Sequence, residues 1–176
     1  GRGWTATGGR PHAEPLALEQ AGEAARGATV YVTLEPCAHE GQTPPCARRL
    51  IDAGVGRVVM AIDDPDPRVA GKGRAMLEAA GIPVTAGVLA EEATLAHAGH
   101  ISRVTRGRPH VLLKLAVSAD GMIGKRQGER MMITGRPALT RVQAMRAETD
   151  AVVIGIGTRL FFPQLHWGVD RDLAII

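Results

Sequence analysis

The chain has 176 residues, of which 45% are hydrophobic, with a formal net charge of +3 and two cysteines. There is no run of 18 apolar residues and no charged-then-apolar N-terminal pattern, which argues against a membrane span and a secretory signal. Lysine and arginine are scattered among acidic residues, which disfavours nucleic-acid binding and allows an anionic small molecule as partner. We therefore expect a cytoplasmic, reducing setting, in which a disulfide between the two cysteines is not expected.

Helices and strands are predicted to alternate over the first hundred residues. The stretch ATVYVTL at 28–34 is rich in β-branched residues, as strands are. Thr43 is a natural N-cap residue ahead of two prolines, so a helix is predicted to start there. Strands that alternate with helices predict an α/β layer with parallel strands. In chain order, the predicted elements are helix 13–25, strand 28–34, helix 43–54, strand 55–63, helix 72–80, strand 82–88 and helix 90–105.

The pattern restarts after residues 105–109, which are predicted to be a domain boundary. A strand is predicted at 110–118, followed by the turn SADG. A helix from about Pro137 to Glu148, capped by Thr134 or Gly135, and a strand at 151–157 come next. The predicted domains are therefore residues 1–107 and 108–176.

Four residues of the first domain have the chemistry of a catalytic zinc site. His12 and Glu14 open one helix, Cys37 follows a strand, and Cys46 lies near the start of the next helix. One imidazole and two thiolates supply the three protein ligands that catalytic zinc takes, leaving a fourth position for water. Glu14 could then carry a proton from that water to a leaving amine. Either a His-x-Glu pair or two buried thiols alone would mean little, but their combination in this order predicts one zinc per chain.

Several motifs together resemble one family, the bifunctional riboflavin-biosynthesis deaminase/reductases. GRPHAE, TLEPCAHEGQTPPC, DPDPRVAGKG, KLAVSADG, ITG and AVVIGIGT occur in this order between about Gly1 and Leu160. The resemblance implies a cytidine-deaminase-like three-layer α/β/α domain, followed by the first part of a dihydrofolate-reductase-like α/β domain. In the family, the first domain deaminates 2,5-diamino-6-ribosylamino-4(3H)-pyrimidinone 5′-phosphate, and the second reduces the ribosyl group with NADPH.

The resemblance also assigns roles to single residues. The zinc ligands would be His12, Cys37 and Cys46, with Glu14 as proton carrier. The substrate-binding residues would be Gln42, Asp64, Asp66 and Arg146, and the NADPH-contacting residues Ala116 and Thr158. Gln42 stands where relatives often have a lysine or arginine that can meet the substrate phosphate, and a neutral side chain loses the charge-assisted part of that contact.

Two of these positions have a plainer interpretation, and one further histidine lies nearby in the sequence. Asp66 is about as well explained by a simple Asp-Pro turn. Arg146 on a helix is by default a solvated surface residue. His39, between the two cysteines, is expected to support the ligands rather than compete with them, because three ligands are already assigned.

The second domain departs from the family pattern. Arg130 and Met132 replace the frequent serine and tryptophan before ITG, and residues 161–163 replace an acidic segment. Little likeness is seen from Phe161 onward. Compared with the family, both ends are expected to be cut, so the reductase half is expected to lack part of its cofactor cradle and to be unable to reduce its substrate.

Two other functions are alternatives to deamination of the phosphorylated pyrimidine. A deaminase of free nucleosides or of RNA bases is disfavoured by the eight residues between the cysteines and by the lack of a basic, aromatic-rich surface. A catalytically silent zinc-holding module is disfavoured by Glu14, which a structural zinc site does not need, although silence through truncation stays open. Homo-oligomer formation also stays open.

Overall fold

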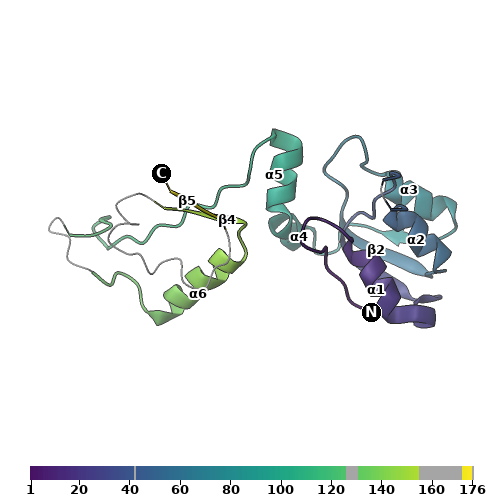
Figure 1. The fold of residues 1–176 in the computed structure, drawn as a ribbon, viewed down its shortest axis with the longest axis horizontal. Helices are drawn as coiled ribbons and strands as arrows, with labels where there is room; N and C mark the ends of the chain where they lie inside the picture. The colour runs from purple at the N-terminus through teal and green to yellow at the C-terminus, as the bar shows by residue number, and fades with distance from the viewer. Residues whose placement is uncertain (42, 126–130, 155–171, 176) are drawn as a thin grey trace. The chain divides into compact units, whose positions relative to one another are not determined.

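The computed structural model describes residues 1–41, 43–125, 131–154 and 172–175 (Figure 1). The chain divides into two compact units, Gly1–Val111 and Leu112–Ile176. Each unit is described by itself. Among the described residues, no helix is long and apolar enough to span a bilayer.

The first unit is built on a three-stranded parallel sheet. Its strands are β1 (Thr29–Leu34), β2 (Arg57–Ile62) and β3 (Val84–Thr85), in the spatial order β1-β2-β3. In the register of the central pair, Leu34 lies opposite Ile62. The carboxyl ends of β1 and β2 therefore meet at the same edge of the sheet, which is where parallel α/β sheets place their ligands.

Helices cover both faces of this sheet. The helices of this unit are α1 (Ala13–Ala21), the 3-10 helix η1 (Gly22–Ala25), α2 (Cys46–Asp52), α3 (Lys72–Ala79), α4 (Ala90–Ala96) and α5 (Ala98–Arg106). Leu50 of α2 and Leu77 of α3 pack with Val58 of β2 in a fully buried cluster. The next side chain, Val59, points to the opposite face and is also buried, and α4 packs against β2. The first unit is thus a layered helix–sheet–helix domain.

Three of the predicted helices have different bounds in the structure, and the one predicted over 13–25 is α1 followed by the 3-10 helix η1. The predicted start at Thr43 is wrong: α2 begins at Cys46, with Pro45 as its N-cap. The physical reason is that a residue before proline is pushed out of the helical region, which disfavours helix at Thr43 and at Pro44. The helix predicted over 90–105 is two helices, α4 and α5, which are interrupted at His97.

The second unit contains one helix and a pair of strands. Helix α6 (Arg136–Ala147) has Gly135 as its N-cap, as predicted. Strand β4 (Ala151–Ile154) pairs in parallel with β5 (Asp172–Ile175), which was not predicted. Residues 118–121 form the predicted turn, in which the Ser118 amide donates to the Met122 carbonyl at 2.8 Å.

The strand predicted at 110–118 is not formed. This segment has no regular secondary structure, and the side chains of Val111, Leu113 and Leu115 are exposed. A strand needs a neighbour that pairs with its backbone groups. Among the described residues, no strand pairs with this segment, and the apolar alternation alone does not order it.

Gly73 in α3 provides a test of how closely α3 packs on the segment after β1. A Cβ atom at Gly73 would lie 1.9 Å from the Pro36 carbonyl oxygen, far inside any real contact. Gly73→Ala should therefore lower the free energy of unfolding by about 2 kcal/mol or more, because the backbone has to move. Urea unfolding followed by circular dichroism measures the change.

The control is Gly99→Ala in α5, where an added Cβ meets nothing within 4 Å. That substitution should be neutral or stabilising by up to about 1 kcal/mol, because alanine is the better helix former. Equal unfolding midpoints for the Gly73 and Gly99 variants would contradict the close approach of α3 to Pro36.

Candidate metal centre

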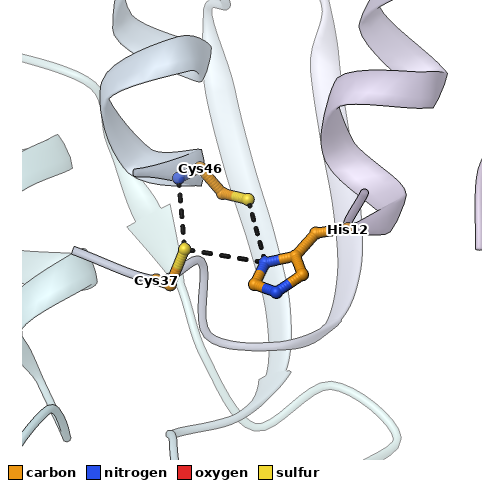
Figure 2. Close-up of side chains that lie close together, drawn as sticks. All are labelled: His12, Cys37 and Cys46. Carbon is orange, nitrogen blue, oxygen red and sulfur yellow. Dashed lines mark hydrogen bonds between the residues drawn. The ribbon is translucent and has the colours of Figure 1, made fainter. Parts of the chain in front are cut away.

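Three side chains from separate elements converge at the carboxyl edge of the first unit's sheet (Figure 2). His12 is the N-cap residue of α1, Cys37 lies shortly after β1, and Cys46 is the first residue of α2. Two backbone contacts fix the cysteines to one another. The Cys46 amide lies 3.3 Å from the Cys37 sulfur, and the Ala47 amide donates to the Cys37 carbonyl at 3.1 Å.

The spacing of the three side chains fits one tetrahedral metal ion. The His12 Nδ1 atom lies 3.6 Å from the Cys37 sulfur and 3.4 Å from the Cys46 sulfur. All ligand atoms of the group lie within 4.8 Å of one another. A zinc ion with bonds of about 2.05 Å to nitrogen and about 2.3 Å to sulfur, at tetrahedral angles, would hold these atoms about 3.6 Å apart. His12 makes no side-chain capping bond, so its ring is free to face the sulfurs.

The two sulfurs differ strongly in their affinity for a proton. The hydrogen bond with Cys46 is the main cause that lowers the pKa of Cys37 to about 5. The same hydrogen bond, together with burial, raises the pKa of Cys46 far above its usual range. The two shifts together favour a single proton between the two sulfurs. A divalent cation between the sulfurs would replace that proton and hold both as thiolates.

Glu14 lies next to the metal group but is not one of its members. It is half-buried in the first turn of α1, and it interacts with the Cys46 thiol and the His12 ring. Burial is the main cause that raises the pKa of Glu14 above its usual value. A half-buried carboxyl group with a raised pKa would be suited to accept and return a proton beside a bound metal.

Asp64 and Asp66 lie in the turn that follows β2, at the same edge of the sheet. The Asp64 carboxylate accepts the Asp66 amide at 2.8 Å, and the Asp66 carboxylate accepts the amide and side chain of Arg68. The hydrogen bond from the Arg68 side chain is the main cause that lowers the pKa of Asp66 to about 2. Both carboxylates therefore have hydrogen-bond partners within the turn, and the two interpretations of Asp66 are compatible with this arrangement.

Glu35 is a residue of this edge that sequence reasoning missed. It is 4% exposed, and its carboxylate accepts three backbone amides from the segment after β2 and the start of α3. Its only signal in the sequence was its position at the end of a strand, two residues before Cys37.

The other candidate residues are less well placed or lie elsewhere. His39 is exposed and is not in the metal group, which gives no support to its expected role beside the ligands. Arg146 is half-buried in the last turn of α6, and Ala116 lies in the irregular segment of the second unit. Gln42 and Thr158 lie outside the described residues, as do 161–163 and Arg130.

Two family models match the chain, one in each unit. The model described as "Cytidine and deoxycytidylate deaminase zinc-binding region" matches residues 4–62, a range that includes His12, Cys37 and Cys46. The model described as "RibD C-terminal domain" matches residues 109–172.

The chain is also similar to curated proteins of known name. It is 52% identical over 153 residues to "Riboflavin biosynthesis protein RibD" of Haemophilus influenzae, covering 87% of this chain and 41% of that protein. It is 46% identical over 160 residues to the protein of the same name of Escherichia coli, covering 91% of this chain and 44% of that protein. The chain belongs to the RibD family. It spans less than half the length of these two relatives.

Solved structures agree with this assignment. A diaminohydroxyphosphoribosylaminopyrimidine deaminase/5-amino-6-(5-phosphoribosylamino)uracil reductase from Thermotoga maritima is 40% identical, with a TM-score of 0.82, over 95% of this chain and half of that one. RibD of Acinetobacter baumannii is 47% identical with a TM-score of 0.76, over 93% of this chain and 47% of that one. The predicted fold class, a cytidine-deaminase-like domain followed by a dihydrofolate-reductase-like RibD segment, is confirmed. The family-model match continues to residue 172, beyond Phe161, from where little likeness was expected.

Zinc content tests the metal group directly. The purified protein should hold about one zinc per chain, as a site with three protein ligands predicts. Cys46→Ala should lose most of it, because one imidazole and one thiolate remain. His39→Ala is the matched control, since this histidine lies between the two cysteines but is exposed. Metal analysis of the gel-filtered proteins provides the measurement, and full zinc occupancy in the Cys46 variant would refute the ligand set.

Proposed function

We propose that residues 1–107 form a zinc-dependent deaminase domain acting on 2,5-diamino-6-ribosylamino-4(3H)-pyrimidinone 5′-phosphate. Residues 108–176 would belong to an NADPH-dependent reductase domain that reduces the ribosyl group of the product. The observation that carries the proposal is the convergence of His12, Cys37 and Cys46 beside the half-buried Glu14. Support also comes from the Thermotoga relative, whose name states both activities, and from the division of the chain between Val111 and Leu112.

Hydrolytic deamination adds water to a ring carbon and releases ammonia from the same carbon. Zinc in such a site supplies a water that is nucleophilic at neutral pH. His12, Cys37 and Cys46 would hold the metal and leave a fourth position open. Glu14 would pass the two protons of the attacking water on, one to the neighbouring ring nitrogen and one to the departing amine, so that a C–O bond forms, the C–N bond breaks and ammonia leaves.

The remaining assignments concern binding. Asp64 and Asp66 would contact the substrate from the turn after β2, and Gln42 would lie near its phosphate. In the reductase domain, Arg146 would contact substrate, and Ala116 and Thr158 would contact NADPH. A cytoplasmic location and formation of a homo-oligomer stay predictions.

Replacing Glu14 separates metal binding from proton transfer. Glu14→Gln should keep the zinc, because Glu14 is not a ligand, but should deaminate about 10²–10⁴-fold more slowly, the usual contribution of a general acid/base group. Glu19→Gln is the matched control, since Glu19 is an exposed residue of the same helix. Ammonia release and zinc content are measured on the same samples. Equal rates in the Glu14 variant and the parent would assign proton transfer to another group.

Substrate choice separates this proposal from a general nucleoside deaminase. The protein should release ammonia from the diaminopyrimidine ribosyl phosphate with a kcat/KM at least about 100-fold above that for cytidine, because a site built for one set of polar groups rejects analogues that leave those groups unpaired. The two substrates are compared at equal enzyme and zinc concentrations. A higher kcat/KM for cytidine would favour the nucleoside deaminase instead.

A further inference from the structure

The Glu35 carboxylate joins two segments that are distant in sequence. Its Oε2 atom accepts the amides of Asp64, at 3.0 Å, and Gly71, at 2.9 Å, and its Oε1 atom accepts the amide of Arg74 at 3.0 Å. A buried charge is costly unless it is fully hydrogen-bonded, and three amides at the start of α3 and in the preceding turn meet that need.

These contacts close the segment 64–71 into a loop with one carboxylate at its base. Oε2 binds the first and the last residue of the loop at once. Inside it, Asp64 accepts the amide of Asp66, so the position of Asp64 determines that of Asp66. A shift of Glu35 would therefore move both aspartates together.

Glu35 is followed by Pro36 and then by Cys37, a candidate metal ligand. Pro36 is fully buried, and its carbonyl lies so close to Gly73 that no Cβ would fit between them. Cys37 follows directly and is tied to α2 through the Ala47 amide. Residues 35–37 thus connect three parts of the domain with little freedom in between. These parts are the loop 64–71 (the aspartate loop), the start of α3 and the metal group.

A purely structural role for Glu35 would be to cap α3. Helices are usually capped by a side chain at their own N-cap position. Here that position is Gly71, which has no side chain, and the cap comes from the end of β1 instead. A local cap would satisfy the helix equally well, but only the distant one also determines how far the aspartate loop lies from Cys37.

We propose that Glu35 is a positioning residue, which holds the loop bearing Asp64 and Asp66 at the distance from the metal group that substrate binding requires. The inference rests on the proposed deaminase function for the reaction that it serves. The hydrogen bonds from the three amides to Glu35, which we call the clamp, are a property of the fold and can be measured without substrate.

The test is Glu35→Gln, which keeps the size of the side chain but turns an NH2 group toward amide donors. The KM for the diaminopyrimidine phosphate should rise about 10-fold or more, because a displaced loop would lose about one hydrogen bond to the substrate, while kcat stays within about 3-fold. Zinc should stay at about one per chain. Glu35→Asp keeps the charge with a shorter reach and should show a smaller rise in KM.

The matched control is Glu78→Gln, which removes a carboxylate from the exposed face of α3, where Glu78 pairs with Arg74. Its KM should equal that of the parent. A parental KM in Glu35→Gln, with or without a lower melting temperature, would overturn the proposal and leave only a helix cap. If Glu35→Gln does not fold, Glu35→Asp decides in the same way.

Hydrogen exchange separates failure of this inference from failure of the proposed function. In the parent, the amides of Asp64 and Gly71 should exchange slowly, and in Glu35→Gln they should exchange at least about 10-fold faster while Val58 in the core is unchanged. Unchanged exchange would refute the clamp. A parent protein that holds zinc and shows the clamp but releases no ammonia would refute the proposed substrate, not the role of Glu35 in placing the loop.

Discussion

The parallel pairing of β1 with β2 is the constraint on which the rest of the first unit depends. Because both strands run in the same direction, the segments that leave them emerge side by side at one edge of the sheet. After β1 come Glu35 and Cys37, and after β2 comes Asp64. The hydrogen bond from the Asp64 amide to Glu35 joins the two exits directly. Helices α2 and α3 then start from the same edge, each held by a residue that follows β1.

Acidic side chains and thiols gather at this edge, and the structure stabilises them in two ways. Three backbone amides donate hydrogen bonds to the Glu35 carboxylate and take the place of water around it. The thiolate of Cys37 instead shares a proton with Cys46, and Glu14 is pushed toward its neutral form by burial. A divalent cation in place of the shared proton would stabilise the site further, because it can bind both thiolates and the nearby imidazole at once.

In the second unit, an apolar sequence pattern alone does not determine which segments become strands. The segment 110–118 has the apolar pattern of a strand, yet it stays irregular with its large side chains exposed. Strand β4, with a similar pattern, forms because β5 is available to pair with it. Pattern sets which residues can form a strand, and a hydrogen-bonding neighbour decides whether they do.

Sequence alone determined the parts of this protein that depend on residue type and local order. The ligand chemistry of His12, Cys37 and Cys46 is a property of their side chains, and the strand at 28–34 follows from its β-branched residues. Tertiary structure decided the rest, because it depends on contacts between distant segments. Nothing in the sequence distinguishes Glu35 from other carboxylates, because its partner Asp64 lies 29 residues further along the chain. The start of α2 at Cys46 follows two prolines.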